Sequence, residues 1–159
     1  MNRRRAARFG AIQALYQLEL TGAPVEQVLL EFQDYRLADL LEPLDQDFPP
    51  AKVDREWFQR VTRGAWRRAF ELDPMIEEML SEGWTLTRLG YLLRACLRAG
   101  AFELADCPDV PARVVINEYV ELAHAFLSAD EAGFVNAILD GLAARVRPDH
   151  QARSGPPAP

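Results

Sequence analysis

Apolar residues recur at spacings of three and four along almost the whole chain, and no segment clearly alternates apolar with polar residues. Near the N-terminus, for example, the residues with this spacing are Phe9, Ile12, Leu15, Tyr16 and Leu20. Residues spaced in this way share one face of a helix, whereas strands require a period of two. A chain of 159 residues can bury a core without a metal or a disulfide. The pattern therefore predicts an all-α fold.

Residues with strong conformational preferences predict where the helices begin and end. The first helix is expected over about residues 4–20, with Gly22 taking the left-handed conformation that closes it. Pro24 suits the first turn of the next helix, where its missing N–H does no harm. Asp54 can cap a third helix, and Ser128 followed by Glu131 fits a capping box.

Prolines and acidic residues divide the chain. Residues 39–54 hold three prolines and five acidic residues, which is typical of a loop. We expect one domain over residues 1–147, in which this loop joins helical subdomains at about 1–40 and 54–147. Residues 148–159 hold four prolines and no large apolar residue, so we expect a disordered tail there.

Further expectations concern the interior. Asp73-Pro74 should break or restart its helix, because the residue before a proline avoids the α region. Residues 99–101 (AGA) form a narrow patch where another helix can approach closely. No CxxC pair is present, so we expect no disulfide between the two cysteines, at positions 96 and 107. The helical spacing predicts burial of Cys96, Leu97 and Leu139.

The charge is distributed unevenly, although the net charge is only −6. Residues 1–18 carry four arginines and no acidic residue, whereas residues 19–82 carry seven basic and fifteen acidic residues. Residues 83–159 carry seven basic and nine acidic residues. A basic leading segment on an acidic body is typical of a protein that meets nucleic acid at one place. A solvated helix end is the alternative.

The leading basic residues are Arg3, Arg4, Arg5 and Arg8, of which Arg4 and Arg8 share a helix face. Cations are unfavourable here because the N-terminal end of a helix dipole is already positive. Phosphates would relieve this conflict, and guanidinium groups bind phosphates bidentately and stack on bases. Against this, seventeen of the eighteen basic residues are arginine, so arginine is simply the usual cation of this chain.

Signatures of catalysis are missing. The chain has no glycine-rich phosphate loop, no HExxH and no GxSxG, so we expect no catalytic residue, no metal site and no cofactor. Its histidines, His124 and His150, lack an evident catalytic partner. No apolar stretch is long enough to span a membrane, and no signal peptide is evident, so we expect a cytoplasmic protein.

Two side chains within apolar helices, one aromatic and one polar, have roles that must be weighed. Tyr16 could stack on a base if it is exposed, although its apolar neighbours favour packing in the core. Asn136 stands in a strongly apolar helix, and we expect it to be buried and to tie a neighbouring loop by hydrogen bonds.

Three motifs occur in order over about residues 3–147. The first is residues 4–8 (RRAAR) followed by 13–16 (QALY). The second is residues 109–111 (DVP) through 115–118 (VINE) and 120–123 (VELA). The third is residues 134–136 (FVN) followed by 138–140 (ILD). Together they resemble the signatures of the NusB transcription antitermination family.

The resemblance implies an all-α fold of two packed subdomains that binds single-stranded boxA RNA of ribosomal RNA transcripts. It implies pairing with NusE, a small-subunit ribosomal protein. The pair would join RNA polymerase and other Nus factors and suppress premature termination. The resemblance leaves the oligomeric state open, a homodimer included.

The resemblance also implies a set of RNA-binding residues. Arg4, Arg5 and Arg8 belong to the opening motif, and Arg3 adds a further cation beside it. Phe126 and Asp130 fall where the family places residues close to RNA, and Tyr16 completes the candidate set. Residues 131–133 (EAG) stand where the family often has a histidine or a basic residue, which removes positive charge there.

Two other functions stay open from the residues alone. NusB-like domains also begin certain ribosomal RNA cytosine methyltransferases, so the chain could be a fragment of such an enzyme. A helical protein-interaction module without RNA function is the other alternative.

Overall fold

The structure is a computed structural model that describes residues 1–152, and over this range it is built from helices without any strand, which confirms the all-α prediction. No helix in the described range is long and apolar enough to cross a membrane. The α-helices are α1 (Arg3–Thr21), α2 (Val25–Glu31), α3 (Leu37–Leu41), α4 (Arg55–Arg67), α5 (Ala69–Glu77), α6 (Tyr91–Asp106), α7 (Ala112–Phe126) and α8 (Ala129–Val146). A π-helical turn, η1 (Phe32–Arg36), and two 3-10 turns, η2 (Pro50–Lys52) and η3 (Leu86–Arg88), connect them.

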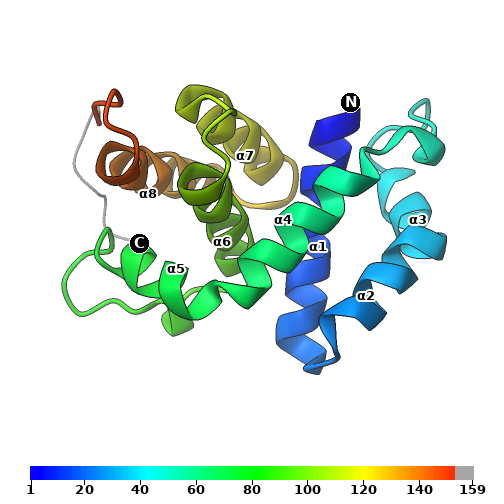
Figure 1. Cartoon of the computed structure of the whole chain (residues 1–159), viewed down its shortest axis with the longest axis horizontal. Helices are drawn as coiled ribbons and strands as arrows, with labels where there is room; N and C mark the ends of the chain where they lie inside the picture. The colour runs from blue at the N-terminus through cyan, green and yellow to red at the C-terminus, as the bar shows by residue number, and fades with distance from the viewer. Residues whose placement is uncertain (153–159) are drawn as a thin grey trace.

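The first helix occupies the middle of the molecule. It packs against α4, and it also contacts α2 and α3 on one side and α6 and α7 on the other (Figure 1). The side chains of Ala6, Ala11, Ile12, Ala14 and Leu18 are fully buried as a result. Helix α4 packs on α1, α2 and α6, so it joins the N-terminal helices to the middle of the chain. The division into subdomains at about residues 1–40 and 54–147 stays a prediction.

The helix boundaries with a local signal in the sequence are confirmed. Gly22 closes α1 with a φ of 67°, and Pro24 precedes the first residue of α2. The carboxylate of Asp54 accepts a hydrogen bond from the backbone N–H of Trp57 at 3.0 Å, which caps α4. Ser128 and Glu131 form both hydrogen bonds of the capping box at the start of α8.

The expected helix break at Asp73-Pro74 is wrong. The break lies at Arg68, between α4 and α5, and α5 runs through Pro74. Pro74 cannot donate to the carbonyl of Phe70, but Phe70 is 76% exposed, so water can replace the missing N–H there. Helical structure also extends to Leu41, past the start of the loop expected over 39–54.

The core contains the residues that the helical spacing predicted. Cys96, Leu97 and Leu139 are fully buried, and both cysteines are free thiols. A Cβ added at Gly100 would lie 2.7 Å from the side chain of Leu139, so α6 and α8 approach closely at the predicted narrow patch.

Three individual residues differ from expectation. Leu20 is 51% exposed, at the end of α1. Asn136 is exposed on α8, so the buried role expected for it is wrong. Of the expected tail, residues 153–159 lie outside the described residues, whereas His150 is described and its Nε2 lies 2.7 Å from Asp140 Oδ1.

Candidate nucleic-acid interface

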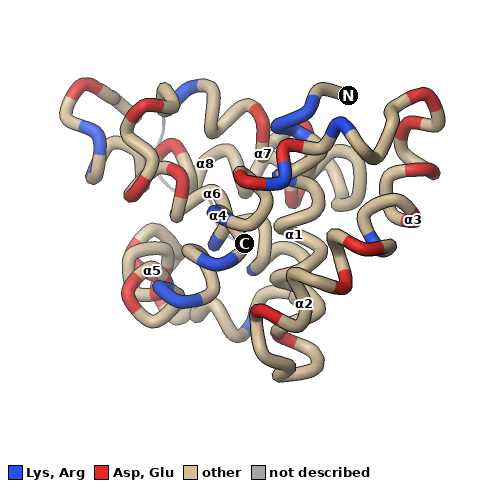
Figure 2. Tube along the Cα trace, turned by 45° about the vertical axis from the view of Figure 1, so that its right-hand side comes forward, with Lys and Arg blue, Asp and Glu red and all other residues tan. Residues whose placement is uncertain are grey.

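The start of α1 presents basic residues beside the N-terminus (Figure 2). Asn2 caps this helix, since its side-chain oxygen accepts a hydrogen bond from the backbone N–H of Arg5 at 2.7 Å. No acidic residue stands in the first turn. The positive end of the helix dipole and the arginine charges therefore coincide, which favours the binding of an anion.

Arg3 and Arg4 are exposed at the edge of an open depression of about 520 Å³. The guanidinium carbon of Arg4 lies 3.9 Å from the ring centroid of Trp57, and its Nε lies 3.8 Å from Asp54 Oδ2. The Nε of Arg3 donates a hydrogen bond to the carbonyl of Lys52 at 3.0 Å. Because the Arg4 side chain stays 44% exposed, it can offer N–H donors to a phosphate while Trp57 fixes its orientation.

Arg5 points toward a different neighbour. Its Nε donates a hydrogen bond to Oε2 of Glu118 on α7 at 2.8 Å, and its Nη2 contacts the same oxygen. The pair joins α1 to α7 and neutralises part of the arginine charge. A phosphate can therefore bind only those guanidinium N–H groups of Arg5 that do not contact Glu118.

Arg8 is buried, unlike Arg3 and Arg4, and its expected role as an RNA-binding residue stays a prediction. Its Nε and Nη2 donate hydrogen bonds to the two carboxylate oxygens of Glu103 at 2.8 and 2.9 Å, and Nη1 lies 3.4 Å from Glu118. The hydroxyl of Tyr119 donates to the same Glu103 carboxylate at 2.5 Å. With 2% of its side chain exposed, Arg8 holds α1 against α6 and α7 and is closed to a ligand in this structure.

The pKa values of this buried cluster reflect its mutual stabilisation. Burial alone would lower the pKa of Arg8, but the hydrogen bonds and the charge of Glu103 outweigh it, and the pKa is raised. Burial, with a smaller contribution from the Glu103 charge, raises the pKa of Tyr119 well above its usual range. The cluster therefore keeps a charged arginine and a neutral tyrosine at physiological pH.

Arg5, Tyr16 and Phe126 are brought to one side of α1. The ring of Tyr16 meets Tyr91 of α6 edge to face at 6.4 Å between centroids, and Phe126 of α7 meets Phe9 of α1 at 6.2 Å. Tyr16 and Phe126 are both partly exposed. Both aromatic residues can therefore pack in the structure and still present an edge to a ligand.

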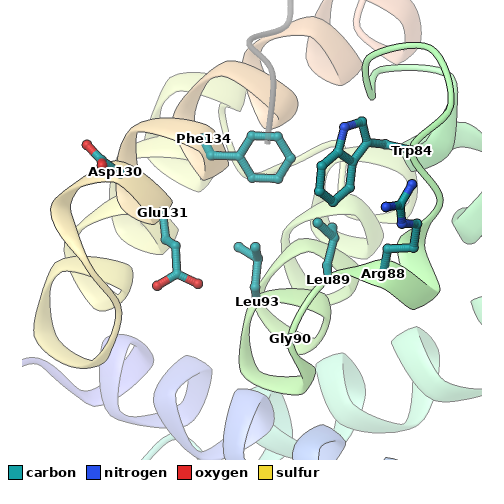
Figure 3. A pocket seen from close by; sticks show the side chains of 8 residues that line it. All are labelled: Trp84, Arg88, Leu89, Gly90, Leu93, Asp130, Glu131 and Phe134. Atoms are coloured by element: carbon teal, nitrogen blue, oxygen red, sulfur yellow. The ribbon is translucent and has the colours of Figure 1, made fainter.

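Asp130 lies apart from the arginines, at a pocket of about 480 Å³ (Figure 3). Figure 3 shows the rings of Trp84 and Phe134 turned toward the cavity, whereas the carboxylate of Asp130 points away from them. Arg88 lies over Trp84, with 4.5 Å from its guanidinium carbon to the ring centroid. Glu131 belongs to residues 131–133, where the family often has a histidine or a basic residue. Its carboxylate accepts a hydrogen bond from the backbone N–H of Ser128.

Sequence reasoning missed the residues that decide what each arginine does. Glu103 and Glu118 stand 95 and 110 residues from Arg8, so no local spacing links them to it. The contact of Trp57 with Arg4 has no sequence signal. Trp84 and Phe134 line one pocket although they lie far apart in the sequence.

Comparison with known proteins gives one consistent result. The model of the NusB family matches residues 5–144. A curated relative from Rhodopseudomonas palustris, named transcription antitermination protein NusB, is 43% identical over 96% of this chain and 86% of its own length. Another of the same name, from Nitrobacter hamburgensis, is 47% identical over 96% of this chain and 92% of its own length.

Solved structures of similar proteins agree. The structure of NusB from T. maritima matches with a TM-score of 0.70 and 29% identity, covering 91% of this chain and 93% of that one. A crystal structure described as the antitermination factors NusB and NusE in complex with double-stranded RNA matches with a TM-score of 0.68 and 25% identity. This second match covers 89% of the present chain and 96% of the chain in that complex.

Proposed function

The chain belongs to the NusB family, and we propose that it is a transcription antitermination protein that binds single-stranded boxA RNA of ribosomal RNA transcripts together with NusE. The observation that carries this proposal is its identity of 43% and 47% with relatives named as antitermination proteins, over nearly the whole chain. The similar fold seen in a complex with NusE and RNA supports both partners.

In this proposal the exposed arginines bind the phosphates of the strand. Arg3 and Arg4 supply the main contacts, because both are exposed and, among residues 1–152, neither has a carboxylate within 3.5 Å. Arg5 adds a weaker contact, since it shares its charge with Glu118. Arg8 does not touch RNA but fixes the helix on which the other three stand.

Tyr16 and Phe126 supply aromatic surface on the side of α1 that faces α6 and α7, and Asp130 stands at the rim of the pocket with Trp84 and Phe134. Aromatic side chains bind single-stranded RNA by stacking on its bases. The proposal therefore assigns phosphate contacts to the start of α1 and base contacts to these aromatic residues.

The protein acts without catalysis and works in the cytoplasm, where RNA polymerase and other Nus factors assemble with it. Its relatives are named as antitermination factors and not as enzymes. The same names, on proteins of similar length, favour this function over a fragment of a ribosomal RNA methyltransferase. An RNA-binding experiment distinguishes this function from that of a helical protein-interaction module without RNA function.

Fluorescence anisotropy with labelled boxA-like RNA, with and without NusE, tests the proposal. We expect boxA-like RNA to bind more tightly than an unrelated single strand of the same length. We expect NusE to increase the affinity further, because a second protein surface on the same strand couples the two binding events. Equal affinities for both RNAs, unchanged by NusE at the same salt concentration, would contradict the proposal.

A further inference from the structure

A second open groove, of about 430 Å³, runs along α4. We call it the α4 arginine groove, since Arg60, Arg63, Arg67 and Arg68 line it together with Glu56 and Phe102. In a chain with a net charge of −6, a lining with four arginines and one carboxylate is a strong local excess of positive charge. Such a surface attracts polyanions.

The charges of this groove are only partly neutralised by neighbours. Arg68 pairs with Glu71 and Asp106, and Arg63 pairs with Glu26 at 2.8 Å. Arg60 donates only to a backbone carbonyl, that of Asp106, at 3.3 Å. Within residues 1–152, no carboxylate lies within salt-bridge distance of Arg60 or Arg67. Two cations along one helix are thus available to an external anion.

The floor of the groove is closed and apolar. A Cβ at Gly64 would lie 2.2 Å from the ring of Phe102, so α4 and α6 are in direct contact at this point. Phe102 is only 5% exposed, which leaves little apolar surface for a protein partner. The centres of protein–protein interfaces are enriched in aromatic surface as well as in arginine. This groove offers arginines but almost no accessible aromatic surface, which favours a polyanion over a protein segment.

The groove is continuous with the arginine surface at the start of α1. Arg4 lies over the ring of Trp57 at 3.9 Å, and Arg60 lies near the same ring at 5.2 Å. The indole of Trp57 thus lies near an arginine from the start of α1 and an arginine of the α4 arginine groove. Arg67 stands seven positions after Arg60, so the row spans about 10 Å along the helix axis.

We propose that the RNA strand held by Arg3 and Arg4 continues along α4, where Arg60 and Arg67 bind its phosphates. This inference rests on the function proposed above. The nucleotides that flank the boxA sequence would then lie along α4. Binding there should not depend on the RNA sequence, because only phosphates are contacted.

The test compares a boxA-like RNA with the same RNA extended by uridines at its 5′ or its 3′ end. For the unaltered protein, we expect one extended RNA to bind more tightly and with a steeper dependence of log affinity on log salt. The variant Arg60→Gln/Arg67→Gln should lose most of this gain, and its slope should be shallower by about 1.4, at roughly 0.7 per phosphate contact of a single strand. Its affinity for the short RNA should be unchanged.

Controls separate charge, fold and position. Arg145→Gln removes an exposed arginine from α8, outside the α4 arginine groove, and it should leave both RNAs bound as before. Arg60→Lys/Arg67→Lys should keep most of the slope, because the charge remains. Thermal unfolding of each variant should match that of the unaltered protein, since Arg60, Arg67 and Arg145 are all exposed.

The outcomes are distinct. Unchanged affinity and slope of Arg60→Gln/Arg67→Gln on both extended RNAs would overturn the proposal and leave the RNA function intact. If that variant loses affinity only for NusE, the groove is a protein contact and the proposal is also wrong. If the unaltered protein binds the short RNA no better than an unrelated one, the function proposed above fails and this inference fails with it.

Discussion

At the scale of single residues, the arginines of α1 have opposite roles despite their adjacency in sequence. Arg3 and Arg4 face solvent, whereas Arg8 is enclosed by Glu103, Glu118 and Tyr119. A buried ion pair of this kind costs desolvation when it forms, but the loss of one partner leaves an uncompensated charge in the core. The cationic residues of this segment therefore cannot be treated as one binding cluster.

Replacing Arg8 by alanine should destabilise the fold by about 3–5 kcal/mol, because Glu103 would stay buried without its partner. The free energy of unfolding, measured by urea titration with circular dichroism, checks this. Arg3→Ala is the control and should leave stability unchanged within about 0.5 kcal/mol, since surface substitutions rarely do more. A similar, small effect of both substitutions would mean that the cluster around Glu103 is misassigned.

The two cysteines should be unreactive in the folded protein. Burial raises the pKa of Cys96 to about 12 and that of Cys107 to about 11. Because the folded state then holds its thiol protons above the pKa of about 8.5 expected in the unfolded chain, the free energy of unfolding should fall as pH rises from about 9 to about 11. A thiol-specific chromogenic reagent at neutral pH should label neither cysteine in buffer and both in urea. Rapid labelling of the folded protein would contradict the burial of Cys96.

At the scale of helices, local signals were predictable and long-range ones were not. Gly22, Asp54 and the Ser128–Glu131 box could be predicted because each acts on residues within one turn of itself. Pro74 was mispredicted because its effect depends on whether water reaches the carbonyl of Phe70, which only the packing decides. The same holds for the candidate site, where the partners of Arg8 come from helices far away in the chain.

The close approach of α6 and α8 gives a test at this scale. Gly100→Ala should destabilise the protein by about 1–3 kcal/mol, because the new Cβ would lie 2.7 Å from Leu139 in a packed core. Gly133→Ala, in α8 with no atom within 4 Å of the new Cβ, should stabilise it by up to about 1 kcal/mol through helix propensity. Thermal unfolding measures both, and a shift of the same sign for the two variants would contradict the packing at Gly100.

At the scale of the whole molecule, the charge layout confines where a polyanion can bind. Acidic residues gather over α3, the loop that follows it, and α5 (Figure 2). The exposed arginines at the start of α1 and along α4 leave a basic surface between these acidic regions. The net charge of −6 should repel RNA elsewhere, so binding depends strongly on a few arginines.

The salt dependence of RNA binding by Arg3→Ala/Arg4→Ala tests the central claim most directly. Each phosphate contact to a single strand contributes about −0.7 to the slope of log affinity on log salt. The double variant should therefore bind boxA-like RNA more weakly, with a slope shallower by about 1.4, while its thermal stability holds or rises because unfavourable charges leave the helix N-terminus. Unchanged affinity and slope would show that these arginines form only a solvated helix end and that RNA binds at another surface.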